Sequence, residues 1–226
     1  MSVAGSRRVS SVALALSAIV LGSCCAAASA GGGEYVYWAN SNYNTIERSN
    51  LDGTRVNPTF ITAVKYSFGV AVSNQYVYWT DYSGIGRANL DGSHVNDKFI
   101  PVPSKYARTW QVPNGEGELA VTSRYLYWAL PGSNTIARAD INGTQLDTNY
   151  LPAAAGVNDP TGLAVDARCV YWTDYVGGTI GRATVNGKTV WQDFITGAIG
   201  PVALAVNSSD GRPRVCATEP QPPAQA

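Results

Sequence analysis

The sequence predicts an all-β protein, a β-propeller of four blades, and three observations predict it. An aromatic pair recurs with spacings of 41, 49 and 44 residues, at Tyr37-Trp38, Tyr78-Trp79, Tyr127-Trp128 and Tyr171-Trp172. Each pair is followed by an arginine and, five residues later, a glycine: Arg48 and Gly53, Arg87 and Gly92, Arg138 and Gly143, Arg182 and Gly187. Seven residues beyond each glycine stands an aromatic residue: Phe60, Phe99, Tyr150 and Phe194. A repeat in the forties with strand-like content is typical of propeller blades.

Within one repeat, the residue types predict each strand in turn. Residues 35 to 38 are aromatic and β-branched, as expected of a strand buried on both faces. Residues 45 to 48 predict a second strand that ends at the turn Asp52-Gly53, expected to be a type I′ hairpin turn. A third strand runs to the apolar pair Phe60-Ile61, and an apolar segment between repeats, such as residues 69 to 72, predicts an inner strand. Each blade is therefore expected to hold four antiparallel strands.

Several motifs recur in register along the chain. Residues 78 to 81 and 171 to 174 read Tyr-Trp-Thr-Asp, and residues 51 to 53 and 90 to 92 read Leu-Asp-Gly. With these motifs the chain resembles the YWTD, or low-density lipoprotein receptor class B, repeat family, in an exported bacterial-type version. The resemblance implies a β-propeller, usually of six blades, that binds partners and performs no chemistry.

The chain departs from that family in two respects. It holds four copies, and in two of them the motif has changed to Tyr-Trp-Ala-Asn and Tyr-Trp-Ala-Leu. In the family the motif aspartate ties neighbouring blades together. The two junctions that lack it are therefore expected to depend more on packing.

The two ends of the repeat array are unequal. Three glycines stand where the first inner strand would be, whereas a surplus apolar strand lies at residues 202 to 206. We therefore expect residues 201 to 207 to complete blade 1 by pairing with residues 35 to 39, which would close the ring and cover two open sheet edges. A rival interpretation starts a fifth repeat at residues 214 to 219, giving a truncated array or half of an eight-bladed dimer. Monomer and homodimer both remain open.

The N-terminal residues 1 to 30 have the layout of a signal peptide, with two arginines, an apolar run and small residues up to Ala30. The propeller domain would then span residues 31 to 219, and the Pro- and Gln-rich residues 220 to 226 predict a disordered tail. Residues 21 to 24 also match a bacterial lipobox with Cys24 as the lipidated residue. The protein is thus expected to be exported, either secreted or periplasmic, or anchored to a membrane through Cys24.

Two cysteines, Cys169 and Cys216, remain after either cleavage. In an oxidising compartment an even pair predicts a disulfide, and two buried free thiols are the alternative. Charge gives no sign of a nucleic-acid partner, because 16 basic residues balance 16 acidic ones.

The recurring residues are interpreted as structural. One arginine per blade at the same position predicts a ring of structural hydrogen-bond donors, and the strict register of the Tyr-Trp pairs predicts core. His94 is the chain's single histidine and is expected to be exposed beside a turn. A single histidine cannot build a multi-histidine metal site, so neither a metal nor a cofactor is predicted.

Function is expected where the repeat breaks. The connection from Pro101 to Gly117 is longer than its counterparts. It carries the ligand-binding candidates Lys105, Tyr106, Arg108 and Trp110. Loops on a rigid scaffold often bind ligands, and Trp, Tyr and Arg are common anchors, although such a loop can instead plug one face of the ring. Tyr66 and Asp159, in two other connections, are expected on the same face.

Two functions are compatible with these residues. The first is a non-catalytic extracytoplasmic binding module for a protein, peptide or glycan. The alternative is a propeller-type lyase or hydrolase with its site on the face of the ring, for which Glu116, Asp159 and His94 are the acid/base candidates. Such enzymes commonly use several histidines or a metal-binding carboxylate cluster, so the residues favour the binding module.

Overall fold

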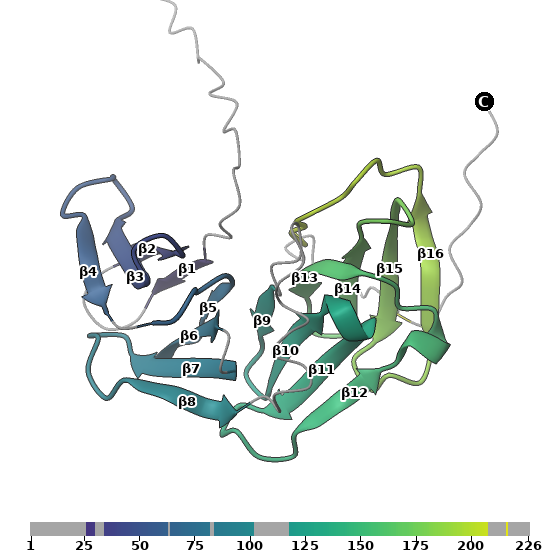
Figure 1. Ribbon diagram of the computed structural model, residues 1–226, viewed down its shortest axis with the longest axis horizontal. Coiled ribbons are helices and arrows are strands. Elements are labelled where there is room, and N and C mark those ends of the chain that lie inside the picture. Colours follow the sequence, from purple (N-terminus) through teal and green to yellow (C-terminus); the bar gives the residue numbers. More distant parts are fainter. Residues whose placement is uncertain are drawn as a thin grey trace, which may run out of the picture.

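The protein forms four antiparallel β-sheets of four strands each. The computed structural model describes the backbone of residues 26 to 29, together with residues 34 to 62, 64 to 81, 84 to 101, 118 to 207 and 216. The sheets follow one another in chain order along an arc, from the N-terminal sheet at one end to the C-terminal sheet at the other (Figure 1). Neighbouring sheets touch through their inner strands. Among the described residues, none of the helices has the length and apolar character needed to cross a membrane.

Each sheet is built from consecutive strands. The first sheet holds β1 (Ala26–Ser29), β2 (Glu34–Asn40), β3 (Thr45–Asn50) and β4 (Asn57–Ile61). The second holds β5 (Val70–Val72), β6 (Tyr76–Asp81), β7 (Gly84–Asn89) and β8 (Asn96–Pro101). The third holds β9 (Leu119–Val121), β10 (Tyr125–Leu130), β11 (Thr135–Asp140) and β12 (Asp147–Leu151), with the short 3-10 helices η2 (Pro131–Ser133) and η3 (Ala153–Ala155) beside it. The fourth holds β13 (Pro160–Val165), β14 (Cys169–Asp174), β15 (Thr179–Thr184) and β16 (Val190–Thr196).

The aromatic pair in the second strand of each sheet explains how the sheets pack. Successive side chains of a strand point to opposite faces, so the two members of a pair face different neighbours. In β6, Trp79 packs in the core shared with the first sheet, and Tyr78 packs in the core shared with the third. Both side chains are fully buried. The pairs thus build the layers between sheets, as the sequence predicted.

Among the described residues, the first and the fourth sheet each have a neighbouring sheet on one side only. Trp38, on the outer face of the first sheet, is only half-buried, and its indole N–H donates to Glu47 Oε2 at 2.8 Å. On the outer face of the fourth sheet, Tyr171 packs with Leu204 and Cys216. The C-terminal segment therefore covers an aromatic face that has no following sheet to cover it.

The predicted pairing of residues 201 to 207 with residues 35 to 39 is wrong. The innermost strand of the first sheet is β1, and its residues pair with Glu34 to Tyr37 in β2. Residues 201 to 207 instead lie at the fourth sheet, where the hydroxyls of Thr161 and Thr173 donate to the carbonyls of residues 201 and 202 at 3.3 and 3.2 Å. A strand four residues away in the chain closes a much shorter loop than the far end of the chain, at a lower entropic cost. β1 also lies within the predicted signal peptide.

The predicted turns occur where expected but have a different type. A type I′ turn would place both Asp52 and Gly53 at positive φ. In the structure Gly53 has a positive φ of 79°, whereas Asp52 does not have a positive φ. The Gly53 N–H donates to the carbonyl of Asn50 at 3.0 Å, and the Asn50 N–H donates to the carbonyl of Thr54 at 2.9 Å. These are the bonds of a type I turn followed by a left-handed glycine, the usual three-residue hairpin.

Candidate functional site

The predicted binding face lies at the end of the sheets where each fourth strand leads into the next sheet. We call it the connection end. Four candidates on the long connection, Lys105, Tyr106, Arg108 and Trp110, fall outside the described residues, as does the acid/base candidate Glu116. Tyr66 and Asp159 are described, and they lie in the connections after the first and third sheets.

Asparagines in the turn between the second and third strands hold both of these connections. Asn44 Oδ1 accepts the backbone N–H of Tyr66 at 2.9 Å, and Asn134 Oδ1 accepts that of Asp159 at the same distance. Both asparagines have left-handed φ values, 58° and 53°, a conformation that asparagine tolerates better than most residues. These two hydrogen bonds, which we call the asparagine lock, fix the backbone of Tyr66 and Asp159 at equivalent positions in their connections.

The two locked residues differ in exposure. Tyr66 is 52% exposed, and its neighbour Lys65 is also exposed. Asp159 is half-buried, and this burial, reinforced by the charge of Asp174, raises the pKa of its carboxyl group. The connection end thus presents one exposed aromatic ring and one carboxyl group in a less polar setting.

The motif aspartate of the fourth sheet has a structural role. Asp174 Oδ1 accepts the N–H of Gly177 at 2.6 Å, and Asp174 Oδ2 accepts Gln192 Nε2–H at 2.8 Å. Gln192 Oε1 in turn accepts the indole N–H of Trp172 at 3.1 Å. The aspartate is therefore tied to its own sheet's turn, outer strand and core tryptophan. Its Oδ1 also accepts Asn158 Nδ2–H at 3.5 Å, from the connection after the third sheet.

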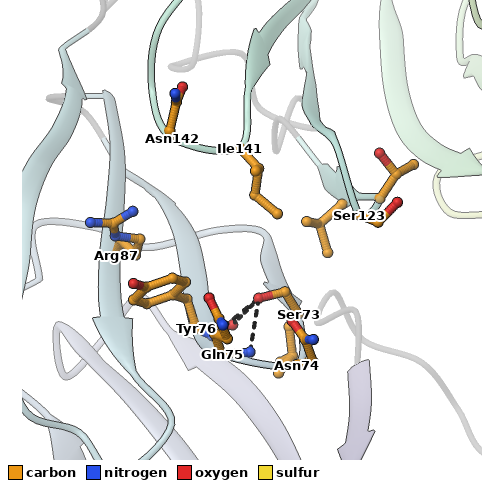
Figure 2. Close-up of a pocket in the computed structure, with 11 residues that line it drawn as sticks. Ser73, Asn74, Gln75, Tyr76, Arg87, Ser123, Ile141 and Asn142 are labelled. Atoms are coloured by element: carbon orange, nitrogen blue, oxygen red, sulfur yellow. Dashed lines mark hydrogen bonds between the residues drawn. The ribbon is translucent and has the colours of Figure 1, made fainter.

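A cavity lies at the opposite end, between the second and third sheets. Its volume is about 700 Å³, and Figure 2 shows that its walls come from the β5–β6 turn, the β9–β10 turn and the turn that follows β11. The lining residues are Val72, Ser73, Asn74, Gln75, Tyr76, Arg87, Val121, Thr122, Ser123, Ile141 and Asn142. We call this space the junction cavity. No signal in the sequence marks this cavity, because most of its residues belong to turns of the kind that recurs in every repeat.

The repeated arginines are structural, as the sequence indicated, but chiefly through aromatic contacts. Each guanidinium lies over two rings, with its central carbon 3.9 to 4.6 Å from the ring centroids. The pairs of rings are Tyr35 and Phe60, Tyr76 and Phe99, Tyr125 and Tyr150, and Trp191 and Phe194. A cation between two aromatic faces is attracted by both. Each sheet therefore has one arginine held in a fixed orientation.

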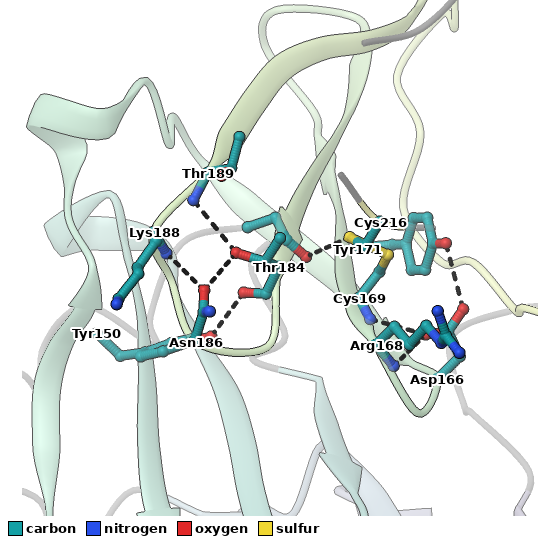
Figure 3. The surroundings of a disulfide bond; sticks show 11 residues. Tyr150, Asp166, Arg168, Cys169, Tyr171, Thr184, Asn186, Lys188, Thr189 and Cys216 are labelled. Atoms are coloured by element: carbon teal, nitrogen blue, oxygen red, sulfur yellow. Dashed lines mark hydrogen bonds between the residues drawn. A yellow bond between two sulfur atoms is a disulfide. The ribbon is translucent and has the colours of Figure 1, made fainter. Parts of the chain in front are cut away.

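Cys169 and Cys216 form a disulfide, with a Cα–Cα distance of 5.8 Å. Cys169 stands at the strand position that Tyr35, Tyr76 and Tyr125 occupy in the other sheets. Figure 3 shows the bond beside Tyr171, on the outer face of the fourth sheet. The disulfide therefore joins a residue near the C-terminus to the sheet face that the C-terminal segment covers.

The remaining acid/base candidate is His94. It is exposed, as predicted, and its Nδ1 lies 3.0 Å from both Asn89 Nδ2 and Ser93 Oγ in the turn after β7. This turn is at the opposite end of the sheets from Asp159, so the structure does not bring the two together. Across the described part of the chain, no three His, Cys, Asp or Glu side chains are grouped so as to hold a metal ion.

Comparisons with known proteins concern the fold. No family model matches the chain. A solved chain of a nidogen/laminin complex superposes with a TM-score of 0.60 at 20% identity, over 77% of this chain and 65% of that chain. Virginiamycin B lyase from Staphylococcus aureus superposes with a TM-score of 0.54 at 20% identity, over 75% of this chain and 55% of that chain. The computationally designed protein Ika8 superposes with a TM-score of 0.53 at 13% identity, over 76% of this chain and 50% of that chain. The chain thus spans less than two thirds of each, and its all-β, propeller-type arrangement is what these comparisons show.

Proposed function

We propose that the protein is a non-catalytic extracytoplasmic binding module that recognises a protein, peptide or glycan at the connection end. The observation that carries this proposal is the asparagine lock, which fixes the backbone of Tyr66 and Asp159. A fixed backbone lowers the entropy lost when a ligand orders the surface. Exposed Tyr66 would supply an aromatic anchor on that backbone. Trp110 and Arg108 are expected to add further anchors, because β8, after which their connection follows in the sequence, ends at this end of the sheets.

The two acid/base candidates that the structure describes give the alternative little support. His94 and Asp159 lie at opposite ends of the sheets, and a general acid and base must reach the same substrate. Solved neighbours include both a nidogen/laminin complex and lyases, and at 20% identity the likeness extends to the fold alone. A lyase or hydrolase would be favoured instead by an activity that a chelator abolishes and a divalent cation restores.

Export is the second part of the proposal. It rests on the layout of residues 1 to 30 and on the pair Cys169 and Cys216, which the structure joins as a disulfide. Cleavage after Ala30 would remove β1, whereas cleavage before Cys24 would retain it. Intact mass spectrometry of the protein from its host distinguishes these products. We expect a soluble protein that begins at Gly31. A diacylglycerol-sized addition on Cys24 would show a lipid-anchored protein, and an uncleaved cytoplasmic chain would contradict export.

The binding proposal is tested with variants of the connection end. The wild-type protein is screened on a glycan array and against the extracellular fraction of its host, and the affinity of the best ligand is then measured. Arg108→Ala with Trp110→Ala, and separately Tyr66→Ala, should each weaken this binding by about tenfold or more, as expected for anchor residues. Leu51→Ala, an exposed residue at the opposite end, is the control and should leave it unchanged. Unchanged binding in all folded variants would exclude the connection end.

A further inference from the structure

We propose that the junction cavity binds a short peptide through a carboxylate group, with Arg87 as the cationic partner. This site goes beyond the proposed function, since it lies at the other end of the sheets and uses different residues. Its volume of about 700 Å³ falls in the range of small-ligand pockets, roughly 300–1,000 Å³. Because the two sites use different residues, the test of one site can fail while the test of the other succeeds.

The cavity lies between two sheets that are not joined by the arginine-to-carbonyl hydrogen bond found at the other two junctions. Arg48 Nη1 donates to the carbonyl of Leu90 in the next sheet at 2.7 Å, and Arg138 Nη1 donates to the carbonyl of Val185 at 3.2 Å. By position in the repeat, the acceptor for Arg87 would be the carbonyl of Ile141. Among the residues that the structure describes, no hydrogen bond joins these two, and both line the cavity (Figure 2). Arg87 thus keeps for a ligand the donor that Arg48 and Arg138 give to the next sheet.

Arg87 is also held ready for an anion. Its central carbon lies 4.3 Å from the ring centroid of Tyr76 and 3.9 Å from that of Phe99. A guanidinium held in one plane loses little entropy when its two N–H groups bind both oxygens of a carboxylate. Among the described residues that line the cavity, Arg87 is the one that carries a charge, so none of these residues offers a carboxylate that competes for it.

The other walls favour a peptide over a sugar. One face of the Tyr76 ring is covered by Arg87, and the ring packs edge-on against Tyr78, so it offers a poor stacking platform for a sugar. Asn74 and Gln75 are exposed at the rim, and their side-chain amides can both donate to and accept from a peptide backbone. Val72, Val121 and Ile141 supply apolar contacts for one small side chain.

Two hydroxyls of the lining are already used. Ser73 Oγ accepts the N–H groups of Gln75 and Tyr76 at 3.2 and 3.1 Å, and Thr122 Oγ1 accepts that of Tyr125 at 2.9 Å. These bonds build the two turns that form the cavity walls. They fix the walls and leave ligand recognition to Arg87 and the rim amides.

The test is a titration of the isotopically labelled full-length mature protein, followed by amide NMR shifts. The probes are acetyl-Val-Ala with a free carboxylate, acetyl-Val-Ala-amide, acetyl-Val-Glu-amide and galacturonic acid. We expect saturable shifts in residues 73 to 76, 121 to 123 and 141 to 142 with a carboxylate peptide, and binding at least tenfold weaker with acetyl-Val-Ala-amide. The two acidic peptides distinguish a C-terminal from a side-chain carboxylate.

Matched variants separate binding from folding. Arg87→Gln should lower the affinity for the carboxylate peptide at least tenfold. Arg138→Gln removes an equivalent arginine, also held between two rings, that does not line the cavity, and it should change the peptide affinity by no more than twofold. Asn142→Asp places a negative charge on the rim of the cavity and should lower the affinity for the carboxylate peptide at least threefold. This change suits the turn, because Asp52 and Asp91 occupy the same repeat position, and Asn186→Asp is its control in the fourth sheet.

Three results would overturn the proposal. The first is that neither acetyl-Val-Ala nor acetyl-Val-Glu-amide causes saturable shifts at the cavity. The second is that acetyl-Val-Ala and acetyl-Val-Ala-amide bind with equal affinity and acetyl-Val-Glu-amide binds no better than they do. The third is that Asn142→Asp and a correctly folded Arg87→Gln protein both bind the carboxylate peptide with the affinity of the wild type. If galacturonic acid binds in the first of these cases, the cavity recognises an acidic sugar rather than a peptide.

Discussion

At the scale of single residues, the tryptophans of the aromatic pairs meet different neighbours in otherwise similar sheets. Across the strand pair, Trp38 stands opposite Glu47, Trp79 opposite Gly86, Trp128 opposite Ala137 and Trp172 opposite Gly181. Where the partner is glycine, the indole occupies the space that a Cβ would fill. The glycine thus serves the close approach of the ring rather than a special backbone angle.

Gly181→Ala should therefore destabilise the protein. The added methyl would overlap the Trp172 indole, which is fully buried and cannot move aside. Overpacking of this kind costs about 1–3 kcal/mol in the free energy of unfolding, measurable by urea denaturation. The reverse change at the same register of the third sheet, Ala137→Gly, should cost about 0.5–1 kcal/mol through backbone entropy. A Gly181→Ala protein as stable as the wild type would contradict this packing.

Asp159→Asn should stabilise the protein at neutral pH. Burial, with the charge of Asp174, raises the pKa of Asp159 above its unfolded value, so ionising this carboxyl costs more in the folded state. The amide removes that cost and, for a half-buried group, should raise the free energy of unfolding by about 0.5 kcal/mol. The gain should disappear as pH falls through the raised pKa, where wild-type Asp159 is protonated in both states. Urea denaturation at pH 7 and at pH 3 checks this, and a loss of stability at pH 7 would contradict it.

At the scale of elements, turns of one sheet complete the packing of its neighbour. A Cβ on Gly92 would come within 2.9 Å of the Phe60 ring of the preceding sheet, and Gly143 and Gly187 meet Phe99 and Tyr150 in the same way, at 3.0 and 3.1 Å. This contact explains why the aromatic residue seven positions after each turn glycine recurs, since it packs over the glycine of the following repeat. The spacing is visible in the sequence, but the partner lies one repeat further on.

Asn134→Ala should loosen the connection after the third sheet. Alanine at this left-handed position costs about 1 kcal/mol, and the lost acceptor for the Asp159 N–H costs about 1 kcal/mol more. Asn134→Gly removes the acceptor alone, so its loss should be about half, provided the extra backbone entropy of glycine is small. The two variants are compared by urea denaturation and by amide hydrogen exchange at Asp159. Equal losses in both would show that backbone strain contributes nothing.

At the scale of the whole molecule, three shared cores hold four sheets in a row, and the C-terminal segment covers the exposed face of the last one. The disulfide secures that cover, because Cys169 belongs to the sheet and Cys216 follows the covering segment. An outer face that would otherwise expose Tyr171 to water is thus protected by the chain's own end.

Reduction of this disulfide should destabilise the protein. The bond links residues separated by 47 positions, and the chain-entropy model gives about 4 kcal/mol for a loop of this length. Denaturation midpoints with and without dithiothreitol measure the effect. The double variant Cys169→Ala with Cys216→Ala is the control and should show no response to the reductant. A wild-type midpoint that does not change on complete reduction would mean that the cover holds without the bond.

The sequence by itself determined the repeat, the order of strands in each sheet, the packing of the aromatic pairs and the positions of the hairpins, because these follow from local periodicity and turn chemistry. It also indicated that one arginine per repeat is structural. Only the tertiary structure decided that β1 pairs with β2, that the C-terminal segment lies on the fourth sheet, and that a cavity lies beside Arg87. These features depend on which of several similar surfaces meet in space. A repeated sequence offers each junction nearly the same residues, so small differences in how neighbouring sheets sit decide whether an arginine reaches a carbonyl or lines a cavity.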